Sequence, residues 1–557
     1  MNHSIFKNSI KKSYLGFTLL ISLLILTSCN NSPKHVEFIP KDAQMVAAID
    51  VPSIFKKGNV NNINDLKLFF LFRKQIRVGN KRLAFLLDDI IEEPATTGIN
   101  YQQDLFYFVI NSAKDESFSA FAWGIKDQKK FNAFTENLFD KLGGEYDLEK
   151  RKNYRRITVN RTLGLAWDDQ KAVLIIPENY RSKENIDFGL QYLMKIKERD
   201  QLAKQDKFQR FLNDKQDISL WLSSNLFENM YPYSKWFKES EYDLTNNYWS
   251  SHINFEDNDI HITMKVDYNK NMQKQLKKHS FDPPNKSNAS LLKYFPKKHY
   301  GVASISLKTE SVYQALESTK ATASFKGFEE ATNIPMKKIF DNLQGNMVAS
   351  LFNIEKKTIS YQVYDYEYDD DGNYQQVEKT REKEIVVPSG AIAVDLQDRK
   401  LIQKLIKSFA ANEIKKRGSY IEIKNGRSYP IYLAYNDNVA YLTNDLKAVK
   451  KFKNGGFDEH LGQSERKTAI VDNQLFFWMN LDFSNYPRET RKNIFGNGND
   501  EQQRMLKIWN SFARNIQITY RNQESLKIKF TINEDEGNSL HNLINIIDRQ
   551  SKFFQAR

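Results

Sequence analysis

The chain has almost no cysteine, because Cys29 is the only one among 557 residues. A single cysteine can form no disulfide within the chain and no cysteine-rich zinc site, and once it is lipidated no thiol nucleophile remains. Long apolar runs are equally scarce: the only one is Leu15 to Leu26, near the N-terminus. Beyond that run, the sequence offers no candidate for a membrane-spanning helix.

The sequence motifs of several enzyme classes are also missing. The chain has no H-E-x-x-H motif, no G-x-S-x-G nucleophile elbow and no P-loop. Its eight histidines are scattered, and the only close pair, His252 and His261, straddles an expected strand and turn. We therefore expect no cofactor and no metal site built on histidine, and we name no catalytic residue.

Charge does not point to nucleic acid. The 82 lysines and arginines outnumber the 69 acids, which gives a net charge of +13, but the two signs are interleaved along the chain. Such mixing is typical of a solvated surface rather than of a basic stripe that binds nucleic acid. With 40% apolar and 13% aromatic residues, the chain can form sizeable cores.

The N-terminal residues have the pattern of a secretory leader. Three lysines and no acid precede the apolar run, which is shorter than the roughly 20 residues that span a bilayer. Leu26-Thr27-Ser28-Cys29 then resembles the cleavage site of a bacterial lipoprotein. The resemblance implies a signal peptide at 1–28, a lipidated tether at 29–36, and lipid attached to the Cys29 sulfur.

The residues after Cys29 suggest a destination. Asn30 stands where an aspartate retains some lipoproteins at the inner membrane, and residues 30–35 lack the acidic run that resembles a surface-export signal. The resemblance therefore implies an outer-membrane lipoprotein on the periplasmic side rather than on the cell surface. The lipid makes the membrane a partner, and an envelope protein or glycan is the candidate for a second one.

Four segments of the first half recur in the same order in the second half. Pro40 and Lys41 match Pro296 and Lys297 at the start of each half, and the later matches also open or extend strands. Colinear matches of this kind indicate an internal duplication. The three later pairs of segments are 119–131 with 390–402, 165–176 with 433–443, and 218–222 with 476–479.

The matches predict two tandem, weakly similar α+β domains. Each half combines mostly antiparallel strands with packed helices. We expect a strand at Met45 to Val51, a helix at Lys129 to Leu142 that stops at Gly143-Gly144, and a matching helix at Lys400 to Ile414. The predicted first domain is 37–282, the linker, marked by two prolines, is 283–290, and the predicted second domain is 291–557.

The sequence also resembles a known family. A lipoprotein leader, the motif Phe38-Ile39-Pro40-Lys41-Asp42-Ala43 before an apolar strand, and two weakly similar halves resemble the Bacteroidota lipoproteins grouped as domain-of-unknown-function family 4836. The resemblance covers nearly all of the mature chain. It implies no activity, substrate or catalytic residue.

Residues 360–385 have no counterpart of similar length in the first half. Tyr364, Tyr366 and Tyr368 alternate with other residues as in a strand, and Asp371-Gly372 is typical of a turn. We predict a projecting hairpin. An alternative is a calcium loop, for which the carboxylates of Glu367, Asp369, Asp371 and Glu378 would supply the ligands, although strands replace the helices that an EF-hand needs.

Aromatic residues between 231 and 249 form a second candidate surface, with Trp236 and Trp249 among them. Such rings can stack on sugars or contact a partner, although most aromatics belong to a core. Together with the hairpin tyrosines they predict a non-catalytic binding or scaffold protein of the envelope. The alternative is an envelope hydrolase acting on glycan or peptide with a carboxylate pair between the two halves.

Overall fold

The computed structural model describes most of the chain beyond the leader. The N-terminal residues 1–32, with Cys29 among them, lie outside the described part. The described residues are 33–59, 93–110, 117–143, 145–159, 162–177, 183–228, 243–278, 288–318, 325–368, 374–408, 414–423, 430–488, 513–521, 525–533 and 537–550, with scattered residues between 66 and 88 and at 490, 491, 510 and 512.

The chain divides into two compact units. Unit 1 comprises Met1–Lys238, Leu244–Asn269 and Glu534–Arg557, and unit 2 comprises Glu239–Asp243 and Lys270–Asn533. Both units combine helices with antiparallel strands, so the predicted α+β class is confirmed. Among the described residues, no helix has both the length and the apolar character needed to cross a bilayer.

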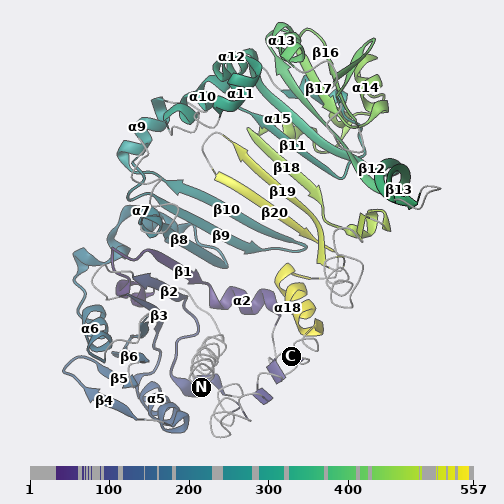
Figure 1. Ribbon diagram of the computed structural model, residues 1–557. Helices are drawn as coiled ribbons and strands as arrows, with labels where there is room; N and C mark the ends of the chain where they lie inside the picture. The colour runs from purple at the N-terminus through teal and green to yellow at the C-terminus, as the bar shows by residue number, and fades with distance from the viewer. Residues whose placement is uncertain are drawn as a thin grey trace. The chain divides into compact units, whose positions relative to one another are not determined.

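The strands of unit 1 lie in the order β4-β5-β6-β7-β3-β2-β1-β8-β9-β10, and every neighbouring pair is antiparallel (Figure 1). Val51 does not extend β1 as predicted, because Asp50 caps a helix that begins at Val51 and has a proline in its first turn. The strands are Met45–Ile49 (β1), Leu105–Ile110 (β2), Phe118–Gly124 (β3), Tyr146–Lys150 (β4), Arg155–Val159 (β5), Leu163–Trp167 (β6), Lys171–Pro177 (β7), Ile218–Ser223 (β8), Tyr248–Phe255 (β9) and Asp259–Asp267 (β10).

Helices cover both faces of the unit 1 sheet. On one face, the apolar stripe of α5 packs against the tryptophans of β3 and β6, and on the other, α6 and α7 bury their apolar side chains against the sheet. The predicted helix is confirmed as α5, which Asp127 caps and which ends at Gly143, where φ is +69°. The α-helices are Val51–Gly58 (α2), Gln128–Leu142 (α5), Lys183–Met194 (α6), Asp206–Asn213 (α7) and Ser539–Gln550 (α18).

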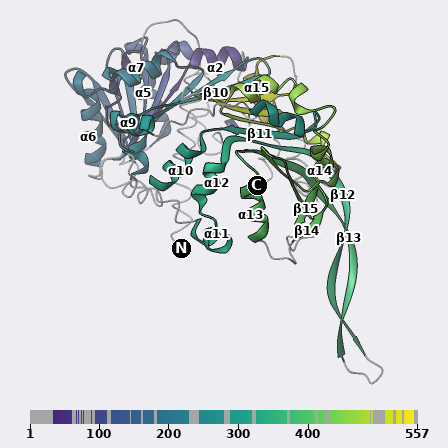
Figure 2. The same ribbon diagram turned by 90° about the horizontal axis from the view of Figure 1, so that it is seen from above.

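The strands of unit 2 lie in the order β14-β15-β16-β17-β13-β12-β11-β18-β19-β20, again all antiparallel. Two of them, β12 and β13, are far longer than the rest (Figure 2). The strands are Gly301–Ser306 (β11), Leu343–Tyr368 (β12), Tyr374–Leu396 (β13), Ile414–Arg417 (β14), Tyr420–Ile423 (β15), Ile431–Tyr435 (β16), Val439–Thr443 (β17), Leu475–Asn480 (β18), Ala513–Arg521 (β19) and Ser525–Ile532 (β20).

The core of unit 2 lies on one face of its sheet, where α14, α15 and the 3-10 helix Asn288–Tyr294 pack. The helix predicted at 400–414 is wrong at its end, because α13 stops at Ser408 and Ile414 pairs with Ile423 as the first residue of β14. The α-helices are Lys270–Lys278 (α9), Thr309–Ser318 (α10), Lys326–Thr332 (α11), Met336–Asn342 (α12), Lys400–Ser408 (α13), Leu446–Lys453 (α14) and Lys467–Asp472 (α15).

The strand orders of the two units correspond position by position. Strand β1 corresponds to β11, β2 to β12, β3 to β13, and the meander β4 to β7 corresponds to β14 to β17. This common order is what an internal duplication would produce. The duplication and the predicted boundaries remain predictions, and most of the predicted linker, 279–287, lies outside the described residues.

Candidate functional site

Strands β12 and β13 continue beyond their neighbours as a two-stranded ribbon. Strand β11 pairs with β12 only as far as Leu351, and β17 pairs with β13 only from Ala391. From Asn353 to Tyr368, β12 pairs with β13 alone among the described residues. The ribbon projects away from the rest of unit 2 (Figure 2), and it begins closer to the sheet than the predicted hairpin at 360–385.

One face of the ribbon carries a charged ladder. Lys379 forms ion pairs with Asp365, at 3.2 Å, and with Glu367, and Arg381 contacts Asp365 at 3.4 Å. The hydrogen bond from Lys379 lowers the pKa of Asp365, and the bond to Glu367 raises the pKa of Lys379. These cross-strand pairs hold the two strands together where the sheet gives no further support.

The opposite face presents tyrosines. Tyr364 and Tyr366 lie two residues apart on β12, and their side chains are 67% and 63% exposed. Residues two apart on a strand share a face, so both rings lie on the side away from the charged ladder. On the same face, the Thr380 hydroxyl donates to the Gln362 side chain at 3.1 Å. The side chain of Tyr368 lies outside the described part of the ribbon.

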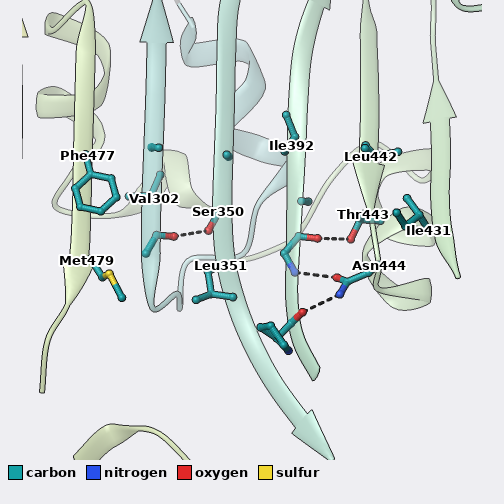
Figure 3. A pocket seen from close by; sticks show the side chains of 16 residues that line it. Val302, Ser350, Leu351, Ile392, Ile431, Leu442, Thr443, Asn444, Phe477 and Met479 are labelled. Atoms are coloured by element: carbon teal, nitrogen blue, oxygen red, sulfur yellow. Dashed lines mark hydrogen bonds between the residues drawn. The ribbon is translucent and has the colours of Figure 1, made fainter. Parts of the chain in front are cut away.

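A surface cavity of about 560 Å³, largely open to solvent, lies where the ribbon joins the sheet (Figure 3). Its lining comes from six neighbouring strands of unit 2, β18, β11, β12, β13, β17 and β16, and is mostly apolar. Ile392 and Leu442 lie in its wall, with side chains 40% and 36% exposed. The sequence did not indicate this cavity, because it depends on which residues the strand register brings side by side.

Comparison with known proteins identifies the family. A family model described as a domain of unknown function (DUF4836) matches residues 35–540. The chain belongs to this family. No curated protein matches this DUF4836 chain. A solved structure entitled "Structure of crystal form IV of TP0453" matches with 8% sequence identity and a TM-score of 0.24, and the match covers 42% of this chain and 81% of that chain. This likeness is too weak to carry an argument about fold or function.

The calcium-loop alternative does not fit the ribbon of this DUF4836 protein. Glu378 lies directly opposite Tyr364 and shares its face, whereas Glu367 lies on the other face, paired with Lys379. The two carboxylates therefore point away from each other. Asp369 and Asp371 lie outside the described residues, which contain no group of three or more His, Cys, Asp or Glu side chains placed to hold a metal ion.

The buried carboxylates of the described residues have structural partners. Asp217 accepts hydrogen bonds from the Ser53 hydroxyl, the Lys57 ammonium and the Phe255 backbone N–H. Asp104 pairs with Lys215. The other two buried carboxylates also accept hydrogen bonds within the fold: Asp395 accepts from the Asn346 amide, and Asp445 caps α14.

The second aromatic surface is only partly described. Trp236 lies outside the described residues. Trp249, in β9, is half-buried, and its ring packs edge-to-face on Phe227 with ring centroids 5.6 Å apart. This contact gives Trp249 a packing role within unit 1, and its role in binding stays a prediction.

Proposed function

We propose that this DUF4836 protein is a non-catalytic binding protein of the cell envelope that holds a protein partner on its β12–β13 ribbon. The observation that carries the proposal is the pair of exposed rings, Tyr364 and Tyr366, on one face of a projecting element. Exposed aromatic clusters commonly mark interaction surfaces, and tyrosine is enriched at the hot spots of protein interfaces.

The backbone of the ribbon favours a protein partner over a glycan. Between Asn353 and Ser389 the two strands pair only with each other in the described structure, so each outer edge presents backbone N–H and C=O groups. Such edges accept an added strand from another protein. A partner segment that pairs with an edge can cover the tyrosine face with its own side chains.

The envelope location rests on the leader. A lipid on Cys29 at the periplasmic face of the outer membrane would hold the described residues, which begin at Pro33, close to the bilayer. The tether is shorter than the predicted 29–36, because the 3-10 helix Lys34–Phe38 packs in unit 1 with His35 buried. The four residues 29–32 reach at most about 14 Å when extended. The ribbon would then meet partners that lie in or near the same membrane.

A photo-crosslinking experiment tests the proposal. A photoreactive amino acid is placed in intact cells at Tyr364 or Tyr366, and for comparison at Val363 or Glu367 on the opposite face. We expect a crosslinked protein of one defined mass from the tyrosine positions and a much weaker product from the other two. Equal products from both faces, or none from the tyrosine positions, would contradict the proposed surface.

Variants then separate binding from folding. The double substitution Tyr364→Ser and Tyr366→Ser should lower co-purification of the crosslinked protein at least tenfold with little change in thermal unfolding, because the rings are exposed. The control double substitution Gln376→Ser and Thr380→Ser changes the same face but removes no ring. This variant should still co-purify with the crosslinked protein. Cys29→Ala should move the protein from the membrane to the soluble fraction. If the protein stays at the membrane, the predicted lipid anchor at Cys29 is wrong, but this result does not contradict the proposed binding surface on the ribbon.

The hydrolase alternative is not proposed. It needs carboxylates that are free to act on a substrate, and the buried ones among the described residues bind lysines, amides or helix N-termini instead.

A further inference from the structure

The origin of the unit 2 cavity becomes clear when one row of residues is compared between the two sheets. In unit 1 the strand register places Ala47, Tyr107, Phe121 and Leu174 side by side on β1, β2, β3 and β7. The rings of Tyr107 and Phe121 lie 4.7 Å apart at their centroids. Phe121 and Leu174 are each only 5% exposed, so this part of the face is filled.

The corresponding row in unit 2 has smaller residues. The register places Ala303, Ala349, Ile392 and Leu442 side by side on β11, β12, β13 and β17. Alanine stands at the position of the tyrosine and isoleucine at that of the phenylalanine. The cavity lies over these residues. In unit 1 the larger side chains of this row pack in one core with α5, whereas no helix residue is among the described residues that line the cavity of unit 2.

The polar side chains of the cavity wall are engaged by the strands themselves (Figure 3). The Ser350 hydroxyl donates to the Gly301 carbonyl at 3.0 Å, and the Thr443 hydroxyl donates to the Gly390 carbonyl at 2.7 Å. The Asn444 amide donates to the Pro388 carbonyl at 2.7 Å and accepts from the Gly390 N–H at 3.0 Å. None of the described lining residues carries a charge, so the wall selects for apolar surface.

The cavity is elongated. It crosses six neighbouring strands, and five intervals of about 4.8 Å give it a length of about 24 Å. Phe477 and Met479 line it at one end and Ile431 at the other. A long apolar trough fits an extended hydrocarbon chain better than a compact ring system or a polar ligand, which would leave its hydrogen-bonding groups unmet.

We propose that this cavity of unit 2 binds one linear acyl chain. The chain would lie across the strands on Ala303, Ala349, Ile392 and Leu442, with its polar end in solvent. Since no charged lining residue holds the polar end, affinity should come from chain length, by up to about fourfold for each added methylene group. This site is separate from the tyrosine face of the ribbon, so it does not rest on the function proposed for that face.

A titration with cis-parinaric acid, a fluorescent linear fatty acid, tests the site. The full chain carrying Cys29→Ala is used, because it bears no acyl chain of its own. We expect saturable binding that palmitate displaces and butyrate does not. Absence of saturable binding, or equal displacement by the two acids, would overturn the proposal.

The structure supplies the decisive variant. The double substitution Ala349→Tyr and Ile392→Phe gives unit 2 the residues that fill this row in unit 1, and it should lower the affinity for cis-parinaric acid at least tenfold. Gln403→Tyr, which adds a ring at an exposed position of α13, should bind like the parent. Unchanged affinity in the double variant, with its unfolding temperature retained, would place the fatty acid elsewhere and overturn the proposal.

A labelling experiment on the unsubstituted protein tests the site even if the double variant does not fold. A linear fatty acid with a photoreactive group near its end should label peptides that contain β12, β13 or β17. Labelling confined to other peptides would overturn the site. The proposal would also be overturned if the parent protein bound no fatty acid but formed a dimer that the double variant abolished. In that case the face would join two copies of the chain.

Discussion

At the scale of single residues, the clearest consequence of burial concerns His35. Its ring lies fully buried beside Phe106, and its Nε2 atom is 2.6 Å from the Asp104 carbonyl oxygen. The pKa of His35 is lowered from 6.5 to about 3, chiefly by burial; the hydrogen bond to the Asp104 carbonyl opposes this effect, and the charges of Lys171 and Lys215 add to it. Protonation of His35 is therefore much easier in the unfolded chain than in the folded one.

This difference predicts a dependence of stability on pH. Between pH 6.5 and 3 the unfolded chain binds the proton at His35 and the folded chain does not, so the free energy of unfolding falls as pH falls, by up to about 1.4 kcal/mol per pH unit. His35→Gln should be less stable than the parent at pH 8 but show a shallower fall, measured by urea unfolding between pH 7 and 5. Parallel curves for the parent and His35→Gln would contradict the prediction.

At the scale of elements, two aspartates that cap helices form a matched pair. Asp445 caps α14 in unit 2 and accepts hydrogen bonds from the N–H groups of Lys447 and Ala448, at 2.7 and 2.9 Å. Asp127 caps α5 in unit 1 and accepts from the Lys130 N–H at 3.0 Å. Asp445 is buried, so its loss leaves two N–H groups with less access to water.

Replacing each cap by alanine should therefore have unequal effects. We expect Asp127→Ala to cost about 1 kcal/mol and Asp445→Ala about 2 kcal/mol. Hydrogen exchange should show faster opening of α5 in the first variant and of α14 in the second. The asparagine variants retain a side-chain oxygen for the same bonds and should recover most of the loss; equal losses from asparagine and alanine would show that capping is not the cause.

The elements also show how far the sequence could predict the fold. The helix α5 could be predicted because Phe131, Phe134 and Leu138 recur at helical spacing between an aspartate and a glycine, all local signals. The cavity could not, because it depends on Ala349 lying beside Ile392, and strand register is set by contacts distant in sequence. The charged and tyrosine faces of the ribbon followed from simple alternation, but its full length did not.

At the scale of the whole molecule, the chain returns to unit 1 after completing unit 2. The last described helix, α18, packs on α2, although nearly 500 residues separate them. The ring of His541 donates from Nδ1 to the Gly58 carbonyl at 2.8 Å and its Nε2 accepts from the Asn545 amide at 2.9 Å. Residues 534–557 thus group with unit 1, although they lie within the second domain predicted from the sequence, 291–557, which stays a prediction.

Truncation after Asn533 tests the consequence. It removes the helix α18 and the hydrogen bonds from Asn538 to the Phe255 carbonyl and from Ser539 to the Asp259 carbonyl, both at 2.9 Å. Because these contacts all lie in unit 1, hydrogen exchange should quicken in α2, β9 and β10 and stay unchanged in the central strands β11, β17 and β18 of unit 2. His541→Ala should produce a weaker change confined to α2 and α18. If hydrogen exchange in the truncated chain instead quickened first in unit 2, the C-terminal helix would stabilise unit 2. The assignment of residues 534–557 to unit 1 would then be wrong.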